Sequence, residues 1–383
     1  MLILNCRHKD ERSFYMSEKK IVKLGVVGCG RGFSVAAQVA GDADVKITAL
    51  CDINPDAMNY AYDYYTKNFK IEGIERYADF DEMLEKADLD AVVVATGADC
   101  HVPYAIKALD AGKHVISEIP AVHSVEEAKM LRVAVKSHPE LKYMMAENCC
   151  FWAFIQGWKT MYENGSFGDI VYAESEYLHS RPQEECRPYI NDKWRAHLHA
   201  INYLTHNLGP LLYLMNDRCV SVTCFESDIK YNPYKEAPST GVALFKTEKG
   251  AIIRILICFG AHVGFDHNFT LMGTKGMIET DRNKICYDAN CFAKLSEVPG
   301  SIDKKFEIPL GTAYRGEYGE MDTGGHGGAD VKMMRSFIDS IIKDTEPPIG
   351  VDLAINMSIC GILAEESARN GGSAVDIPSA DEL

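Results

Sequence analysis

A glycine-rich turn at the end of the first apolar run constrains the fold of this chain more than any other feature. The segment Gly25-Val26-Val27-Gly28-Cys29-Gly30-Arg31-Gly32-Phe33 follows a strand-like run and opens a helical one. Glycines there permit a tight turn and let backbone N–H groups approach a phosphate at the positive end of a helix. Gly32 stands one position before the usual third glycine. The motif predicts a strand, turn and helix that bind a dinucleotide.

The first part of the chain alternates short apolar runs with helical patterns, which indicates a parallel sheet covered by helices. We therefore predict a Rossmann-type α/β domain over residues 20–148. Residues 1–19, which are charged and include Met16 as a second candidate start, are expected to form a disordered N-terminal extension. The expected strands are 21–27, 45–51, 91–95, 114–117 and 142–146, and the expected helices are 33–40, 55–69, 103–111 and 125–137.

The remainder of the chain, residues 149–383, has a different pattern. Strand candidates follow one another with turn signals between them, which predicts an α+β domain built on a large, mostly antiparallel open sheet. An open sheet leaves an apolar face that needs cover, so a homodimer or homotetramer through that sheet is expected. The expected helices are 151–164, 196–216, 329–343 and 353–370, and the expected strands are 170–179, 219–229, 241–247, 251–259 and 268–272.

Composition excludes several classes of protein. Lys plus Arg number 40 against 55 for Asp plus Glu, and this net charge of -15 argues against a nucleic-acid surface. No apolar run approaches the roughly 20 residues of a membrane span, and residues 1–16 lack the apolar core of a signal peptide. The 13 cysteines include no Cys-x-x-Cys pair, which favours reduced thiols over disulfides or zinc. We expect a soluble cytoplasmic protein, without nucleic-acid or membrane partners, that binds a small molecule.

Asp52, at the end of the second expected strand, decides the predicted cofactor. A carboxylate there accepts hydrogen bonds from ribose hydroxyls and repels the extra phosphate of NADP. The cofactor is therefore predicted to be NAD. The alternative, a glycine turn with a capping aspartate, fits the βαβ context less well.

Tyr177 and His179 fall on the same face of the strand expected over 170–179, because strand side chains repeat every two residues. A phenol beside an imidazole can act as a general base if a nearby positive charge, or NAD itself, favours the phenolate. The alternative is the polar edge of a half-buried strand.

The segment 196–216 offers a second set of polar side chains. If it forms one helix, Arg195, His199, Tyr203 and His206 share a face opposite to a leucine-rich one. Such directional donors suit sugar hydroxyls, although a solvated helix face is the alternative. His197 and His199 point in divergent directions on a helix, and no other cluster has ligand spacing, so no metal site is predicted.

Further segments resemble the Gfo/Idh/MocA superfamily of NAD(P)-dependent sugar oxidoreductases. They are Ala95-Thr96, His101, Ala111-Gly112-Lys113-His114-Val115, Glu118, Pro120 and Glu147-Asn148. The resemblance implies that Thr96, Glu118 and Asn148 line the nicotinamide end of the site, although the usual Thr-Pro-Asn is Thr96-Gly97-Ala98 here. The predicted cofactor-binding set is Gly28, Gly30, Arg31, Gly32, Asp52, Thr96, His101, Glu118, Pro120 and Asn148.

Ile119 departs from the superfamily pattern at a position that matters for chemistry. Members usually carry Glu-Lys-Pro there and use the lysine in hydride-transfer chemistry, whereas this chain has Glu118-Ile119-Pro120. An isoleucine cannot move a proton. The chain thus keeps a nicotinamide-binding framework without the usual dehydrogenase residue.

The chain looks most like a glycosidase branch of that superfamily, the NAD-dependent α-N-acetylgalactosaminidases, from about residue 20 to its end. In that branch an aliphatic residue also replaces the lysine. This chain departs from the branch at Leu204, where proline is common, at Asn207, where glycine is common, and over 217–260. The similar segments are Glu118-Ile119-Pro120-Ala121, Glu147-Asn148, Ser166-Phe167-Gly168, Tyr177-Leu178-His179, Trp194-Arg195, 203–210, Gly273-Thr274-Lys275-Gly276 and Gly325-His326-Gly327-Gly328.

Position by position, this resemblance implies Tyr177 as the base at sugar C2, with Glu147, His179, Tyr203 and His206 around the reacting ring. Arg195, His199 and His326 are the expected substrate-binding residues. The implied reaction on a pyranoside, with α-N-acetylgalactosaminide as one candidate, is transient oxidation at C3, deprotonation at C2, elimination and water addition, redox-neutral overall.

Two other functions stay open from the sequence. The first is a plain NAD-dependent sugar or polyol dehydrogenase in which Tyr177 or His206 replaces the missing lysine. The second is a non-catalytic NAD-binding sensor, which the set of Tyr, His and Glu side chains disfavours. The dehydrogenase would accumulate NADH, and the redox-neutral enzyme would not.

Overall fold

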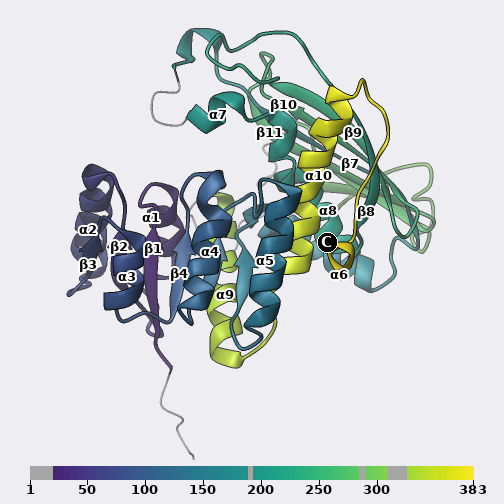
Figure 1. The fold of residues 1–383 in the computed structure, drawn as a ribbon. Coiled ribbons are helices and arrows are strands. Elements are labelled where there is room, and N and C mark those ends of the chain that lie inside the picture. The colour runs from purple at the N-terminus through teal and green to yellow at the C-terminus, as the bar shows by residue number, and fades with distance from the viewer. Residues whose placement is uncertain (1–19, 189–192, 284–289, 309–325) are drawn as a thin grey trace, which may run out of the picture.

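The computed structural model describes residues 20–188, 193–283, 290–308 and 326–383. The expected disordered extension, residues 1–19, lies outside the described residues. Figure 1 shows two lobes, one built on a small sheet with helices beside it and one built on a larger sheet.

The first lobe contains a six-stranded parallel sheet in the order β3-β2-β1-β4-β5-β6, which is the strand order of dinucleotide-binding folds. Its apolar strands are almost fully buried, as expected for a sheet covered on both faces. The sequence did not predict the short pair β3 and α3. The strands are β1 (Val22–Val27), β2 (Val45–Cys51), β3 (Glu75–Tyr77), β4 (Ala91–Val94), β5 (His114–Ser117) and β6 (Tyr143–Met145).

Two helices of this lobe, α2 and α5, begin directly after a residue whose side chain caps them. Asn54 caps α2 by accepting from the N–H of Asp56, and Ser124 caps α5 by accepting from that of Glu127. The elements are α1 (Arg31–Ala36), η1 (Ala37–Val39), α2 (Pro55–Phe69), α3 (Phe80–Lys86), η2 (Ala98–Cys100), α4 (His101–Asp110), α5 (Val125–Ser137) and η3 (Asn148–Phe151).

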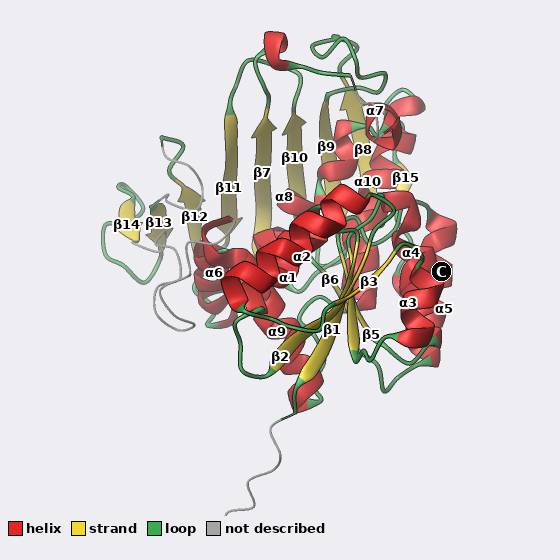
Figure 2. Cartoon of the chain, turned by 90° about the vertical axis from the view of Figure 1, so that its left-hand side faces the viewer, coloured by secondary structure: helices red, strands yellow, loops and turns green. Residues whose placement is uncertain are grey.

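The second lobe contains a nine-stranded sheet in the order β14-β13-β12-β11-β7-β10-β9-β8-β15. Only the pairing of β10 with β7 is parallel, so the predicted mostly antiparallel sheet is confirmed. Figure 2 shows its central strands standing side by side. The strands are β7 (Ile170–His179), β8 (Cys219–Glu226), β9 (Thr240–Thr247), β10 (Ile252–Cys258), β11 (Phe265–Gly273), β12 (Gly276–Thr280), β13 (Cys291–Leu295), β14 (Phe306–Ile308) and β15 (Val375–Asp376).

Helices cover one face of this sheet, while apolar side chains such as Leu244 and Ile252 lie exposed on the other. The predicted fold class, a Rossmann-type domain plus an α+β domain, is confirmed. The helical elements that follow residue 152 are α6 (Ala153–Glu163), η4 (Gln183–Glu185), α7 (Lys193–His197), η5 (Ala200–Tyr203), α8 (Thr205–Met215), η7 (His326–Gly328), α9 (Ala329–Lys343), α10 (Val351–Arg369) and η8 (Ala380–Glu382). Of these, α9 packs against the first lobe.

The prediction of one continuous helix over 196–216 is wrong. The chain breaks into α7, η5 and α8, because His199 is extended and the N–H of Ala200 donates to the carbonyl of Pro238 instead of to the preceding turn. The shared face proposed for Arg195, His199, Tyr203 and His206 therefore does not exist as a helix face.

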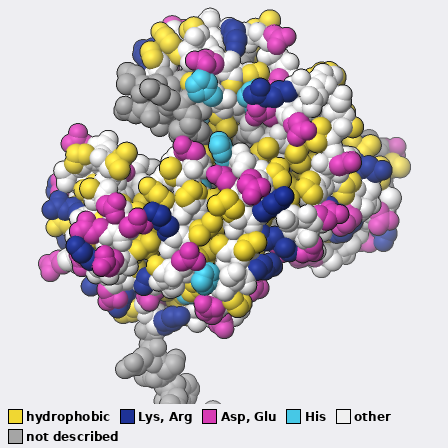
Figure 3. Space-filling model, in the orientation of Figure 1, with side chains coloured by type: hydrophobic (Ala, Val, Ile, Leu, Met, Phe, Trp, Pro, Cys, Tyr) yellow, Lys and Arg dark blue, Asp and Glu magenta, His cyan; other side chains and the backbone are white. Residues whose placement is uncertain are grey.

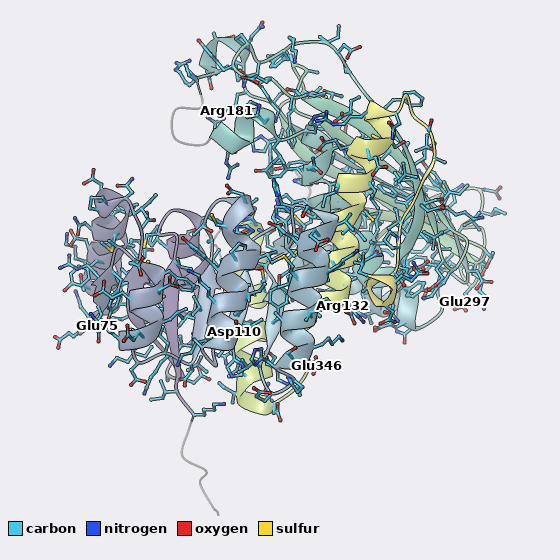
Figure 4. The ribbon with its side chains drawn as sticks, viewed as in Figure 1. Glu75, Asp110, Arg132, Arg181, Glu297 and Glu346 are labelled. Atoms are coloured by element: carbon cyan, nitrogen blue, oxygen red, sulfur yellow. The ribbon has the colours of Figure 1, made fainter. Side chains whose placement is uncertain are left out.

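Helices α9 and α10 tie the lobes together. Arg335 on α9 pairs with Asp42 and Asp44 of the first lobe at 3.0 and 2.8 Å. Arg132 on α5, labelled in Figure 4, pairs with Asp352 at the start of α10 at 3.0 Å. Because α9 packs beside β1 and α1, the predicted domain boundary at residue 148 stays a prediction.

The surface and the thiols agree with the composition. Lys and Arg side chains are interspersed with Asp and Glu on the face drawn in Figure 3. Among the described residues no helix is both long enough and apolar enough to cross a membrane. Within the described part of the chain, the 11 cysteines lie outside disulfides, and nine of them are buried.

Candidate active site

The glycine turn after β1 has the shape that a bound pyrophosphate needs. Gly28 has a φ of 87°, and a Cβ there would lie 2.3 Å from the carbonyl oxygen of Ala95. Gly32 lets α1 approach the sheet, since its Cβ would lie 3.0 Å from Ala95 and from Val26. A Cβ on Gly30 would meet nothing within 4 Å, so the N-terminal end of α1 is open for a ligand.

Asp52 lies directly after β2, and its carboxylate faces the same turn. One oxygen accepts from the N–H of Cys29 at 2.6 Å, and the other accepts from the N–H of Asn54 at 2.7 Å. The carboxylate is thus fixed beside the glycine turn, where a ribose would lie. The glycine turn and Asp52 together fit an NAD molecule.

The segment after β5 forms the next part of this edge. His101 is buried, and its two ring nitrogens lie 2.9 Å from the carbonyl oxygen of Pro120 and 3.3 Å from that of Thr96. Burial lowers the pKa of His101, so the ring is neutral and its single N–H donates to only one of these two carbonyls. The structure therefore places His101 behind Thr96 and Pro120 as a support for them. Ile119 is half-buried and packs against the core.

Asp330, which the sequence did not predict, connects the cofactor edge to α9. Its buried carboxylate accepts from Arg31 through two hydrogen bonds of 3.0 Å, from Asn148 at 2.8 Å and from His326 at 3.1 Å. Arg31 also donates to Glu118 at 2.9 Å. Burial would raise the pKa of Asp330, but the hydrogen bonds from His326 and Arg31 bring it well below its ordinary range. Four predicted residues, Arg31, Glu118, Asn148 and His326, thus meet in one ion-pair network.

Glu147 and His206 form a hydrogen-bonded acid and base pair beside that network, with Glu147 buried and His206 half-buried. Glu147 Oε1 lies 2.7 Å from His206 Nδ1, and the side chain of Glu147 is fully buried. Burial alone would raise the pKa of Glu147 and lower the pKa of His206. Their mutual attraction reverses both directions, so the pKa of Glu147 falls and the pKa of His206 rises. His206 is therefore placed to hold a proton near neutral pH.

Cys149 completes a group whose ligand atoms all lie within 4.8 Å of one another, together with Glu147 and His206. The Cys149 sulfur lies 3.3 Å from His206 Nδ1, the nitrogen that Glu147 already contacts. Two partners on one ring nitrogen make a hydrogen-bonded group rather than ligands arranged around a central ion. The absence of a metal stays a prediction.

Tyr177 stands at the centre of a cluster of rings at the carboxyl end of β7. Its ring centroid lies 5.6 Å from those of His179 and His206, and 5.0 Å from that of Phe259. The ring of His267, on β11, stacks on it at 4.0 Å. The shared face predicted for Tyr177 and His179 is present, with Tyr177 buried and His179 exposed.

The ionisation of His179 follows from its surroundings. Burial of part of the ring lowers the pKa of His179, and the positive charge of Arg181 lowers it further. Arg181 follows β7 and is labelled in Figure 4. A neutral imidazole therefore lies beside Tyr177.

Of the residues expected around the substrate, the structure brings Arg195 and Tyr203 to the ring cluster but not His199. Arg195 donates to the hydroxyl of Tyr203 at 2.6 Å, and the Tyr203 ring lies 5.8 Å from Phe259. His199 is buried in a separate network, 2.6 Å from Glu226 and 3.0 Å from Arg369 on α10. A substrate-binding role for His199 stays a prediction that this placement does not favour.

Three residues of the site were not singled out as site residues from the sequence. Asp330 follows His326 by one helical turn, and a carboxylate at that spacing could have signalled a pair. His267 alternates with Phe265 and Phe269 on β11, but the strand was expected to begin only at residue 268. Asn207 was noted only as a departure from the family pattern, and no signal in its position indicated a bond to His267.

Comparisons with known protein families agree with this geometry. Residues 22–146 match the model of an oxidoreductase family with an NAD-binding Rossmann fold, and residues 155–279 match a GFO/IDH/MocA C-terminal domain. Residues 234–381 match the C-terminal domain of glycosyl hydrolase 109. The chain therefore carries Gfo/Idh/MocA domains and a glycosyl hydrolase 109 C-terminal domain. The predicted family, the NAD cofactor and the assignment as an enzyme are confirmed.

Individual relatives of this chain are distant but span nearly its whole length. A glycosyl hydrolase family 109 protein of Solibacter usitatus is 27% identical, covering 93% of this chain and 87% of that one. An alpha-N-acetylgalactosaminidase of Shewanella oneidensis is 25% identical, covering 94% and 85%. The solved structure of a levoglucosan dehydrogenase with NADH and levoglucosan superposes with a TM-score of 0.79 at 21% identity, covering 94% of this chain and 100% of that chain.

Proposed function

We propose that the protein is an NAD-dependent glycoside hydrolase that cleaves a pyranoside, with α-N-acetylgalactosaminide as the first candidate, without net oxidation. The observation that carries the proposal is the position of Tyr177. Its phenol lies in a ring cluster next to the Glu147–His206 pair, while Ile119 stands where a dehydrogenase would carry a lysine. The family 109 C-terminal domain and the names of the relatives support the same class.

The cofactor edge would hold NAD through the N-terminal end of α1 and the carboxylate of Asp52. Bound there, NAD supplies the reversible two-electron oxidation of one sugar carbon, which we assign to C3. The ion-pair network around Asp330 fixes Arg31, Glu118 and Asn148 at the edge that faces the sugar.

The side chains of the sheet lobe perform the proton transfers. A ketone at C3 acidifies the hydrogen on C2, because the resulting carbanion is delocalised as an enolate. Tyr177, as the phenolate, removes that proton, and the bond from C1 to the aglycone breaks. His206, which holds a proton through its contact with Glu147, can protonate the departing oxygen. Water then adds at C1 and gives one proton back to His206, Tyr177 returns a proton to C2, and the C3 carbonyl is reduced again.

This route differs from ordinary glycoside hydrolysis. Two carboxylates usually flank the scissile bond and support an oxocarbenium-like transition state. In the candidate site Glu147 is hydrogen-bonded to His206 and Asp330 to Arg31, so each carboxylate has a partner in the site. The proposed elimination needs no carboxylate nucleophile.

A dehydrogenase of sugars or polyols is the second candidate, because solved dehydrogenases share this fold. Ile119 disfavours the dehydrogenase, because an isoleucine cannot move a proton. A non-catalytic sensor has less support, since Tyr177, Glu147 and His206 are brought together as a reactive set. The exposed apolar face of the nine-stranded sheet supports a homodimer or homotetramer, and a cytoplasmic location stays a prediction.

The function is tested by incubating the protein with a panel of nitrophenyl glycosides, beginning with the α-N-acetylgalactosaminide, while nitrophenol and NADH absorbance are followed together. Release of nitrophenol without accumulating NADH supports the glycosidase. Accumulating NADH without nitrophenol would make the protein a dehydrogenase, and neither signal across the panel would favour the sensor.

Replacement of Tyr177 in the same assay tests the assigned base. Tyr177→Phe should reduce nitrophenol release by about 1,000-fold, because the phenol that takes the C2 proton is lost, while NAD still binds. Tyr172→Phe is the matched control, since Tyr172 lies on the same strand and donates to Glu174. Normal turnover in Tyr177→Phe would contradict the assignment.

A further inference from the structure

His267 is the nearest ring to the proposed catalytic base. It lies on β11 directly opposite Tyr177 on β7, and the two rings stack with centroids 4.0 Å apart and planes inclined by 21°. Trp152 packs edge-on against the imidazole at 5.0 Å, and only 3% of His267 is exposed. The phenol ring of Tyr177 therefore stacks on an imidazole that is itself buried and packed against Trp152.

A hydrogen bond from α8 fixes the orientation of that imidazole. The side-chain oxygen of Asn207 lies 3.2 Å from His267 Nδ1, and the amide nitrogen of Asn207 donates to the hydroxyl of Ser175. An amide oxygen can only accept, so Nδ1 of His267 carries the proton and Nε2 does not. All three side chains are buried and come from β7, α8 and β11.

The groups that face His267 keep it neutral. Burial lowers the pKa of His267 well below its ordinary value, and the positive charge of a protonated His206 lowers it further. The charged groups of the adjoining elements have partners of their own: Glu147 contacts His206, and Asp330 pairs with Arg31 and His326. None of these contacts places a carboxylate against the His267 ring.

We propose that Asn207 and His267 are positioning residues for Tyr177: Asn207 holds His267 in its Nδ1–H tautomer, and the neutral imidazole fixes the plane of the phenol ring. This inference rests on the proposed function, because it assumes that Tyr177 takes the C2 proton. A fixed ring plane aims the phenol oxygen, and small misplacements of a reacting group cost large factors in rate. Because the His267 ring is neutral, it adds no charge of its own that would change the ionisation of the Tyr177 phenol.

The tautomer is tested directly by nitrogen NMR on protein labelled with ¹⁵N-histidine, with His267→Gln to assign the signal. The expected result is a protonated Nδ1 and an unprotonated Nε2 that do not change between about pH 5.5 and pH 8.5. A proton on Nε2, or a ring that titrates in that range, would overturn the proposal. This readout needs no turnover, so it stands or fails separately from the glycosidase assay.

Replacing Asn207 by aspartate tests the link to Tyr177. Asn207→Asp keeps the size of the side chain but places a carboxylate on Nδ1, so the His267 ring should become protonated. The positive charge should favour the phenolate of Tyr177 and move the acid limb of the kcat/KM pH profile down by about one unit. Ser175→Ala is the control, because it leaves the contact between Asn207 and His267 in place. A protonated His267 with an unmoved pH profile would contradict the proposal.

Two substitutions of His267 separate stacking from folding. His267→Phe keeps a flat ring under the phenol and should retain kcat within about fivefold, whereas His267→Ala should lower kcat by about 100-fold with little change in KM. The thermal unfolding of both variants is measured beside kcat. If the alanine variant remains folded and keeps the kcat of the phenylalanine variant, the imidazole does not position Tyr177.

Discussion

The glycine turn after β1 and the ring cluster at the end of β7 differ in how many parts of the chain build them. The turn and its helix come from one stretch, with Asp52 added from the next strand. The ring cluster draws on β7, β11, α8 and the residue after β10, and the connected ion-pair network adds η7 and α9. Backbone geometry thus governs the glycine turn, and side-chain contacts between distant segments govern the ring cluster.

This difference predicts different responses to mutation. At the cofactor edge, a substitution should act according to the space around a single Cα atom. In the ring cluster and its ion-pair network, a substitution should act by leaving buried polar groups without a hydrogen-bond partner, because these groups depend on one another.

The largest effect is expected for Gly28→Ala. The added Cβ would meet the backbone oxygen of Ala95 at 2.3 Å, and the φ of 87° is strained for alanine, so we expect a loss of about 3 kcal/mol in unfolding free energy and of NAD binding. Gly30→Ala is the matched control. Its Cβ meets nothing within 4 Å, so stability should change by less than about 0.5 kcal/mol. Urea unfolding and NAD titration measure both variants, and equal stability losses would contradict the comparison.

An intermediate effect is expected for Asp330→Asn. Arg31 would lose its buried carboxylate partner but keep Glu118, so the unfolding free energy should fall by about 3 kcal/mol near neutral pH. The pKa of Asp330 is lowered by folding from its ordinary value of 3.8. Its stabilisation is therefore present above that value and is lost as the pH falls below it. The difference in unfolding free energy between the wild type and the variant should therefore shrink as the pH falls below about 4.

Asp339→Asn is the control for that experiment. Asp339 lies on the same helix and pairs with Arg335 and Lys343, but its side chain is 31% exposed. The loss should therefore stay below about 1 kcal/mol. Urea unfolding as a function of pH measures both variants, and a gap for Asp330→Asn that is independent of pH would show that the ion pair is not its source.

The smallest effect is expected for Glu147→Gln, which should change a protonation state more than the fold. The carboxylate of Glu147 raises the pKa of His206 against the effect of burial, so its removal should lower that pKa. The stabilisation from a raised histidine pKa is full below the ordinary value of 6.5 and fades as the pH rises through the folded value. In the variant no carboxylate offsets the burial, so this stabilisation should be lost.

Proton NMR of the His206 ring measures this shift. Glu163→Gln, which removes an exposed partner of Lys159 on α6, should leave the His206 titration unchanged. An unaltered His206 titration in Glu147→Gln would mean that the pair does not control the proton.

The sequence predicted the first strand, the glycine turn and the position of Asp52 after the second strand, because glycine spacing and strand ends are local signals. It also placed Tyr177 and His179 on one face, since alternation along a strand is local too. The prediction of one helix over 196–216 was wrong because the backbone is extended at His199. That conformation depends on the carbonyl of Pro238, which no helical pattern reveals. For the same reason Asp330 and His267 were missed, as their roles arise from contacts between distant segments.

The central claim is that Tyr177 exchanges the proton on sugar C2 during glycoside cleavage. The direct measurement is the deuterium content at C2 of the sugar released in D₂O from nitrophenyl α-N-acetylgalactosaminide, or from the glycoside of the panel that is cleaved. The proposed mechanism predicts one deuterium at C2 in the product, with no accumulating NADH. A product released with its original C2 hydrogen would contradict that mechanism.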